Sequence, residues 1–189
     1  MTEQQPYDIV RTDANFEVRL YPEHVVAEVT VRSDFDDAGS RAFRYLFGYI
    51  TGANTRKQRL AMTAPVVQSA ADEGPETIEM TSPVVQRSEA DGSIHVVTFV
   101  LPKNMTATTA PTPTSPEVRI RTVPEALVAV MRYPGRWTQK AYDEHCALLL
   151  ERLHSAGLTP IGVPRFARYD PPYTLWLLKR NEVLVDLER

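Results

Sequence analysis

Hydrophobic side chains alternate with other side chains in two stretches near the N-terminus. Every second residue is apolar in residues 16–21, and residues 25–32 repeat this pattern. Because successive side chains of a strand point to opposite faces, both stretches are predicted to be half-buried antiparallel strands. Residues 94–101 are apolar on both faces and are predicted to be a central strand, with residues 183–187 as a closing C-terminal strand.

A helical period predicts two helices between these strands. The first covers about residues 36–50, where Asp34 or Asp36 can cap the N-terminus and Gly52 can end the helix. The second covers about residues 137–156 and combines a conventional core face with charged positions.

Short motifs recur in the same order in the two halves of the chain. Residues 17–20 (EVRL) recur at 117–120 (EVRI), and residues 22–27 recur at 124–129. Each pair of predicted strands precedes a predicted helix. The chain is therefore predicted to contain two copies of a strand–strand–helix–strand unit.

The length favours a single domain over residues 1–189, with two similar halves at about 7–105 and 117–189. Short antiparallel units that alternate with two helices predict an α+β fold rather than a doubly wound parallel sheet.

A third repeat is shorter and carries proline in both copies. Residues 60–68 resemble residues 78–86, with a polar loop at 69–76 between them. Proline cannot donate to a sheet ladder, so both copies are predicted to be edge, bulged or irregular strands. Residues 106–116 are rich in Thr and Pro and are predicted to form an extended surface loop.

Composition narrows the class of protein. Apolar residues make up 43% and charged residues 24%, the usual mixture of a soluble globular protein, and the net charge of −3 includes no basic stripe for nucleic acid. No apolar run approaches the roughly 18 residues of a membrane span, and no signal segment is visible. We expect a cytoplasmic protein without a nucleic-acid or membrane partner, and nothing in the sequence indicates a protein partner.

The first predicted helix is unusually aromatic. Its apolar arc spans roughly 200°, wider than the stripe of about 100° that a surface helix needs, and Phe43 and Phe47 lie one turn apart at its border. Either these rings pack against a neighbouring loop, or they floor a cleft for a flat apolar ligand with Ser40, Arg41 or Arg44 at its polar edge.

Motifs of catalysis and metal binding are missing from the sequence. The four histidines have no metal-ligand spacing, and His145 and Cys146 are adjacent, which makes a poor chelate on a helix. There is no Gly-rich phosphate loop, no Gly-x-Ser-x-Gly elbow and no Rossmann fingerprint. The residues indicate no catalytic constellation and no metal ligand.

Several motifs together resemble the SOUL haem-binding protein family, over about residues 7–187. The segments that carry the resemblance are YDIV at 7–10, FEVRLY at 16–21, YITGAN at 49–54, LAMTAPV at 60–66, ARYDPP at 167–172 and RNEV at 180–183. The resemblance implies a distorted eight-stranded antiparallel β-barrel flanked by two helices and built from two similar halves, like the gyrase-inhibitor-like ligand-binding modules.

The resemblance also implies non-covalent binding of haem or a related tetrapyrrole in a shallow apolar cleft beside the first helix. In this chain, Phe43 and Phe47 match the two apolar positions that line the cleft, with Ser40 and Arg44 at its edge. The facing loop supplies the remaining residues, which are Tyr169, Pro171, Pro172, Tyr173 and Trp176.

One branch of the family places a proposed axial histidine where this chain has Leu20, and His24 lies across a predicted turn. We therefore expect binding by apolar contact, stacking and pairing of propionates with Arg or Lys, with metal-free porphyrin bound about as well as haem.

Three functional hypotheses follow. The first is a carrier or buffer of haem without chemistry of its own. The second is an enzyme that removes the chelated metal, with Tyr169, Tyr173 or His24 as proton donors. The third is a gyrase-inhibitor-like regulatory module that binds another amphipathic molecule or a protein.

Overall fold

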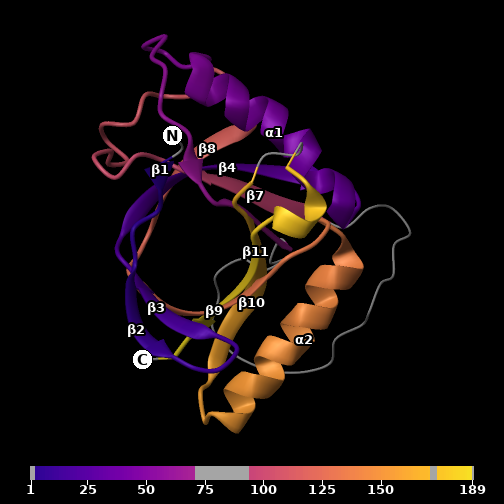
Figure 1. Cartoon of the computed structure of the whole chain (residues 1–189). Helices are drawn as coiled ribbons and strands as arrows, with labels where there is room; N and C mark the ends of the chain where they lie inside the picture. Colours follow the sequence, from indigo (N-terminus) through magenta and orange to yellow (C-terminus); the bar gives the residue numbers. More distant parts are fainter. Residues whose placement is uncertain (1–2, 71–93, 171–173, 189) are drawn as a thin grey trace, which may run out of the picture.

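A computed structural model describes residues 3–70, 94–170 and 174–188. Two helices lie against the outside of a strongly curved sheet (Figure 1). The helical elements are α1 (Phe35–Thr51), α2 (Gln139–Ser155) and the 3-10 helix η1 (Trp176–Leu178). The strands are β1 (Glu3–Gln4), β2 (Asp8–Thr12), β3 (Glu17–Tyr21), β4 (His24–Arg32), β5 (Thr63–Ala64), β6 (Val66–Ala70), β7 (Ile94–Val100), β8 (Val118–Val123), β9 (Ala126–Tyr133), β10 (Pro160–Arg168) and β11 (Asn181–Leu187).

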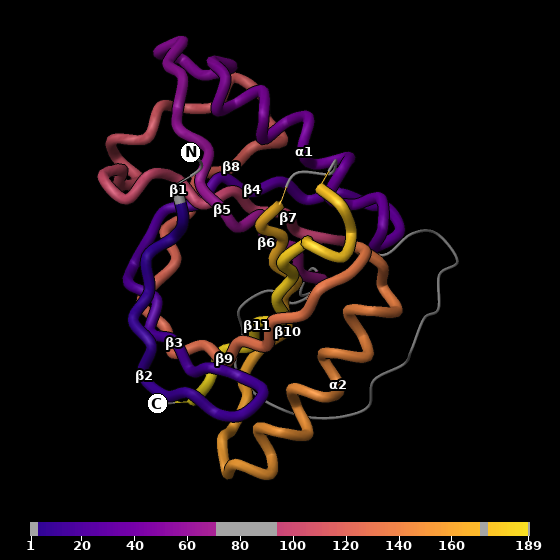
Figure 2. The backbone as a smooth tube through the Cα atoms, in the orientation of Figure 1, coloured from indigo at the N-terminus to yellow at the C-terminus, as the bar shows by residue number. Residues whose placement is uncertain are grey.

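The main sheet confirms the predicted α+β, antiparallel, two-helix architecture. Its nine described strands are all antiparallel, in the order β2-β3-β9-β11-β10-β6-β7-β4-β8, and β1 pairs with β5 in a separate parallel ladder. The sheet therefore has one strand more than expected. It bends into the ring seen in Figure 2 but stays open, because β2 and β8 are edges that do not pair with each other.

The two spatial halves of the sheet exchange their first strands. One half is β8-β4-β7-β6 with α1, and the other is β3-β9-β11-β10 with α2. Strand β3 precedes β4 in sequence but pairs with β9, and β8 precedes β9 but pairs with β4. The recurring motifs at 17–20 and 117–120 thus occupy equivalent strands, each in the spatial half that the other copy mainly builds.

The helices cover the convex face of the sheet, and alternation along each strand decides what faces them. On β7, Val97 and Phe99 are buried in the cluster beneath α1, which also contains Leu46 and Ile50. Their neighbours Val96 and Thr98 line the concave side. The period of two therefore separates a helix-facing core from an interior surface.

Helix ends follow the expected chemistry in part. Gly52 ends α1 with φ 126°, as predicted, and Asp34 occupies the N-cap position without a side-chain capping bond. The carboxylate of Asp36 instead accepts the backbone N–H of Gln139 at 2.9 Å, at the start of α2. An acidic side chain in the first turn of one helix thereby caps the other.

The proline-containing repeat is irregular where it is described. Pro65 separates the two-residue β5 from β6, as expected of a strand that carries proline. The second copy at 78–86 lies outside the described residues, as do residues 71–76 of the predicted loop. Residues 106–116 form the expected loop, and the hydroxyl of Tyr49 anchors it by donating to the carbonyl of Pro111 at 2.9 Å.

Candidate functional site

The two phenylalanines of α1 are exposed, although most of the helix's apolar side chains are buried. Phe43 is 39% exposed and Phe47 45%, whereas Ala42 and Leu46 are fully buried. The two rings stack with centroids 5.2 Å apart and planes 15° apart, and Phe43 also meets the buried Phe99 edge-on at 5.6 Å. The exposed parts of these two rings form an apolar patch on the outside of the molecule.

Polar and cationic side chains continue this surface toward the start of the helix. Ser40 and Arg44 are exposed, and with Asp37 and Arg41 they line a shallow hollow on α1. Guanidinium groups pair strongly with carboxylates. This end of the surface can therefore hold the acidic groups of a ligand whose apolar body covers Phe43 and Phe47.

A second exposed apolar surface lies on and just before η1. Leu175, Trp176, Leu177 and Leu178 are 58%, 46%, 57% and 73% exposed. In Figure 1, η1 lies between α1 and α2. We call the four side chains of this segment, together with Phe43 and Phe47, the α1–η1 surface.

Contacts through Trp137 link the end of η1 to α1. The ammonium nitrogen of Lys179 lies 3.8 Å from the centroid of the Trp137 ring, and Cζ of the Arg168 guanidinium lies 5.1 Å from the same centroid. A Cβ atom placed on Gly39 of α1 would overlap that same guanidinium. The residue after η1 and the first turns of α1 therefore pack around one pair of side chains.

The remaining predicted loop residues are not all at this surface. Tyr169 donates its hydroxyl to Glu182 at 2.7 Å, and the Arg180 guanidinium lies 3.9 Å from its ring. Pro171, Pro172 and Tyr173 lie outside the described residues. Of the predicted facing residues that are described, Trp176 is exposed and Tyr169 takes part in a buried polar network.

This network was missed by sequence reasoning. Glu182 is fully buried and accepts hydrogen bonds from Arg19 at 2.9 and 3.1 Å and from Arg180 at 2.7 Å. Burial opposes ionisation of Glu182, but the hydrogen bonds and charges of the two arginines outweigh it and hold its pKa below the ordinary value. The available signal was an acidic residue near the start of a mainly apolar strand.

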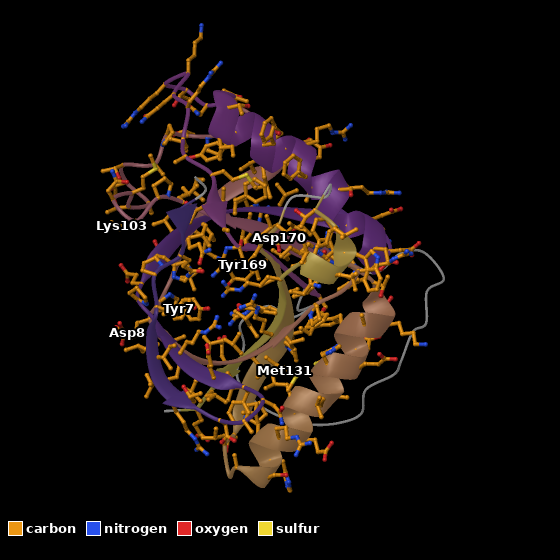
Figure 3. All side chains as sticks on the ribbon, in the orientation of Figure 1. Tyr7, Asp8, Lys103, Met131, Tyr169 and Asp170 are labelled. Carbon is orange, nitrogen blue, oxygen red and sulfur yellow. The ribbon has the colours of Figure 1, made fainter. Side chains whose placement is uncertain are left out.

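Tyrosines complete the network inside the ring of strands. Tyr7 and Tyr169 both lie there (Figure 3), and the Arg19 guanidinium is 4.2 Å from the Tyr7 ring. Burial raises the pKa of Tyr169 above its ordinary value. The network is well paired and buried, so it is suited to stabilising the interior rather than to exchanging protons with a ligand.

Comparison with known families decides the relationship. The model of the SOUL haem-binding protein family matches residues 2–186. The chain belongs to the SOUL family. The resemblance seen in the sequence motifs is thereby confirmed, and haem or small-molecule binding is the activity that this membership supports.

Solved structures with the same fold are distant in sequence. The C-terminal domain of EcmrR is 12% identical, with a TM-score of 0.63 over 97% of this chain and 98% of that one. An uncharacterised conserved protein from Listeria innocua is 13% identical, with a TM-score of 0.65 over 92% of both chains. A hydrolase from Listeria innocua is also 13% identical, with a TM-score of 0.63 over 95% and 94%. At these identities the likeness shows that this SOUL chain shares their fold, and no curated protein matches its sequence.

The described residues contain neither a metal-binding cluster nor a membrane-spanning helix. In the described part of the chain, no group of three or more His, Cys, Asp or Glu side chains is placed to hold a metal ion. Across the same residues, no helix is both long and apolar enough to cross a membrane.

Proposed function

We propose that this SOUL protein binds haem or a related tetrapyrrole non-covalently on the α1–η1 surface, and carries or buffers it without chemistry of its own. One observation carries the proposal. Six of the ten exposed large hydrophobic side chains among the described residues belong to α1 and the η1 segment. Exposed apolar groups that are concentrated on two short segments favour a binding surface, whereas singly scattered ones do not.

The chemistry of the surface fits a planar amphipathic macrocycle. Stacked aromatic rings cover a flat apolar face well, and each square ångström of apolar area removed from water contributes roughly 25 cal/mol. Arg41 and Arg44 line the hollow beside the rings and would pair with propionate groups.

Axial coordination of iron has no support at this surface. His24 lies on β4 and lines the concave side of the sheet, opposite the face that α1 covers. Leu20, at the position of the family's proposed histidine, lies on β3 in the other spatial half. Because the proposed contacts involve the macrocycle and its acidic groups, metal-free protoporphyrin should bind about as tightly as haem.

Titration with hemin, followed at the Soret band, tests the proposal alongside metal-free protoporphyrin. The double variant Phe43→Ala/Phe47→Ala should bind both ligands at least tenfold more weakly. The matched control is Ile9→Ala/Val10→Ala, which removes another exposed apolar pair, 54% and 59% exposed, on the edge strand β2. Equal weakening in both double variants, or no saturable binding by the unmodified protein, would contradict the proposal.

Fluorescence during incubation with haem separates binding from chemistry. A carrier leaves the haem spectrum unchanged after binding. Growing emission from metal-free porphyrin, together with released iron, would contradict the carrier proposal and indicate a metal-removing enzyme.

A further inference from the structure

The concave face of the sheet encloses a cavity that the α1–η1 surface does not use. Its volume is about 260 Å³, and its lining comes mainly from β4 and from β6 to β11. Pockets for drug-sized ligands usually measure roughly 300–1,000 Å³. The cavity therefore has the size of a small organic molecule.

One part of the cavity wall is apolar and largely buried. The side chains that form it come from five strands: Val26, Val67, Val96, Val100, Val128 and Leu184. A molecule with a hydrocarbon or aromatic body would replace water against this wall, which is favourable in proportion to the apolar area covered.

Hydrogen-bond donors gather at another part of the wall. One terminal amino group of Arg165 donates a hydrogen bond to Asp186. The Nε–H of Arg165 is buried and has no hydrogen-bond partner within the described residues. A buried donor without an acceptor carries a desolvation penalty that an incoming oxygen atom would relieve. Of the lining residues, Asp186 alone is acidic, and Arg165 already occupies it.

Arg121 is a second cation in the wall, and both arginines act on the neighbouring His24. Arg121 pairs with Glu28 through Nε at 2.9 Å, and half of its side chain is exposed. Burial lowers the pKa of His24, and the charges of Arg165 and Arg121 lower it further, against its hydrogen bond to the Pro22 carbonyl. The same charges that disfavour a proton on His24 would favour an anion in the cavity.

From this geometry we infer that the cavity is a second ligand site, which binds a small monocarboxylate with an apolar body. The carboxylate accepts hydrogen bonds from Nε of Arg165 and from the terminal amino groups of Arg121. The apolar body lies against the valines and Leu184. This site is on the face of the sheet opposite α1, so it is independent of the proposed tetrapyrrole surface.

Isothermal titration with benzoate tests the inference, with uncharged benzamide of the same shape as the comparison ligand. We expect saturable benzoate binding at least tenfold tighter than that of benzamide, and Arg121→Gln should remove most of this preference. Ala126→Phe, which fills the cavity from β9, should abolish binding of benzoate. Absence of benzoate binding, equal affinity for benzamide, or unchanged affinity in Ala126→Phe would overturn the inference.

Two controls keep the outcome interpretable. If Ala126→Phe fails to fold, Ser69→Leu fills the same cavity from β6 and takes its place. The folded cavity variant should retain hemin binding, and Phe43→Ala/Phe47→Ala should retain benzoate binding. Competition between hemin and benzoate would contradict two independent sites.

Nuclear magnetic resonance adds a readout that loss of folding cannot imitate. Saturating benzoate should raise the pKa of His24, because it places a negative charge near an imidazole that now faces Arg121 and Arg165. An unchanged His24 titration in the presence of bound benzoate would place the ligand elsewhere.

Discussion

The carboxylate of Glu182 shows how one residue organises the interior of this protein. It has no exposed surface and is bound by two guanidinium groups and one phenol. Arg19 is only 3% exposed; its buried counter-charge is Glu182, and it also pairs with the partly exposed Glu17. Loss of one partner from such a buried group leaves the other charges uncompensated.

Replacing Glu182 by Gln should therefore lower the free energy of unfolding by about 3–5 kcal/mol. Glu17→Gln is the matched control, because Glu17 also pairs with Arg19 but is 34% exposed. The Glu17 carboxylate is partly solvated and Arg19 keeps Glu182 as its counter-charge, so this variant should lose only about 1 kcal/mol. Urea denaturation at pH 7 measures both, and similar losses in the two variants would contradict the ranking.

The free energies of unfolding of the unmodified protein and of Glu182→Gln should become more similar in acid. The pKa of Glu182 is lowered in the folded state, so its stabilisation is complete above the ordinary carboxyl value of 4.5 and declines as pH falls below it toward the folded pKa. The stability difference between the unmodified protein and Glu182→Gln should shrink over that range, as measured by urea denaturation in steps from pH 7 to 3. A constant difference over that range would show that the fold does not lower the pKa of Glu182.

Some residue-level features could be predicted from the sequence and others could not. The helical period placed Phe43 and Phe47 at the border of the apolar arc, and both are exposed as a ligand surface requires. The Glu182 network could not be predicted in this way, because Arg19 lies 163 positions away in the chain. No local pattern encodes a contact of that length.

At the scale of elements, α1 is held to the sheet by a close approach at Gly39. The guanidinium of Arg168 lies against this glycine and donates to Gln68 at 2.8 Å. Its Cζ lies 5.1 Å from the centroid of the Trp137 ring and 4.9 Å from that of Phe166. Burial lowers the pKa of Arg168 to about 10, so it stays charged at neutral pH. An added methyl group at Gly39 would have to displace a cation that several groups hold in place.

Two glycine substitutions in α1 isolate this effect. Gly48→Ala places a methyl group 3.8 Å from the Ala53 side chain and should stabilise by about 0.4–1 kcal/mol, since alanine favours helix. Gly39→Ala makes the same change in the same helix but overlaps Arg168, and should destabilise by about 1–3 kcal/mol. Thermal unfolding of both variants measures the difference, and stabilisation by Gly39→Ala would refute the close approach.

Element boundaries were largely predictable, since both helices and the central and C-terminal strands lie within two or three residues of their expected positions. Periodicity reports which face of an element is buried, and this information is local. It does not report which strand is the neighbour, so the pairing of β3 with β9 was not predicted from the pattern.

At the scale of the whole molecule, the exchange of β3 and β8 makes each spatial half depend on both parts of the chain. Strand β4 needs β8 to cover one of its edges, and β9 needs β3. The ladder between β6 and β10 then joins the halves into one sheet. Neither part of the sequence contains all the strands of a complete half.

We therefore expect fragments 1–105 and 106–189, produced separately, to lack a cooperative unfolding transition. Mixed in equal amounts, they should recover the circular dichroism and the cooperative transition of the intact protein. The cut lies in the loop between β7 and β8, so no strand is severed. Cooperative unfolding of either fragment alone would show that a half is self-sufficient.

The interlocked arrangement of β3 and β8 also constrains how the protein can change over generations. A duplicated unit that stood alone could be discarded, swapped or reshaped without harm to its twin. Here the first strand of each half of the sequence, β3 or β8, completes the sheet of the other half. A substitution that changes the ligand preference of one half must therefore also preserve the strand pairing on which the other half depends.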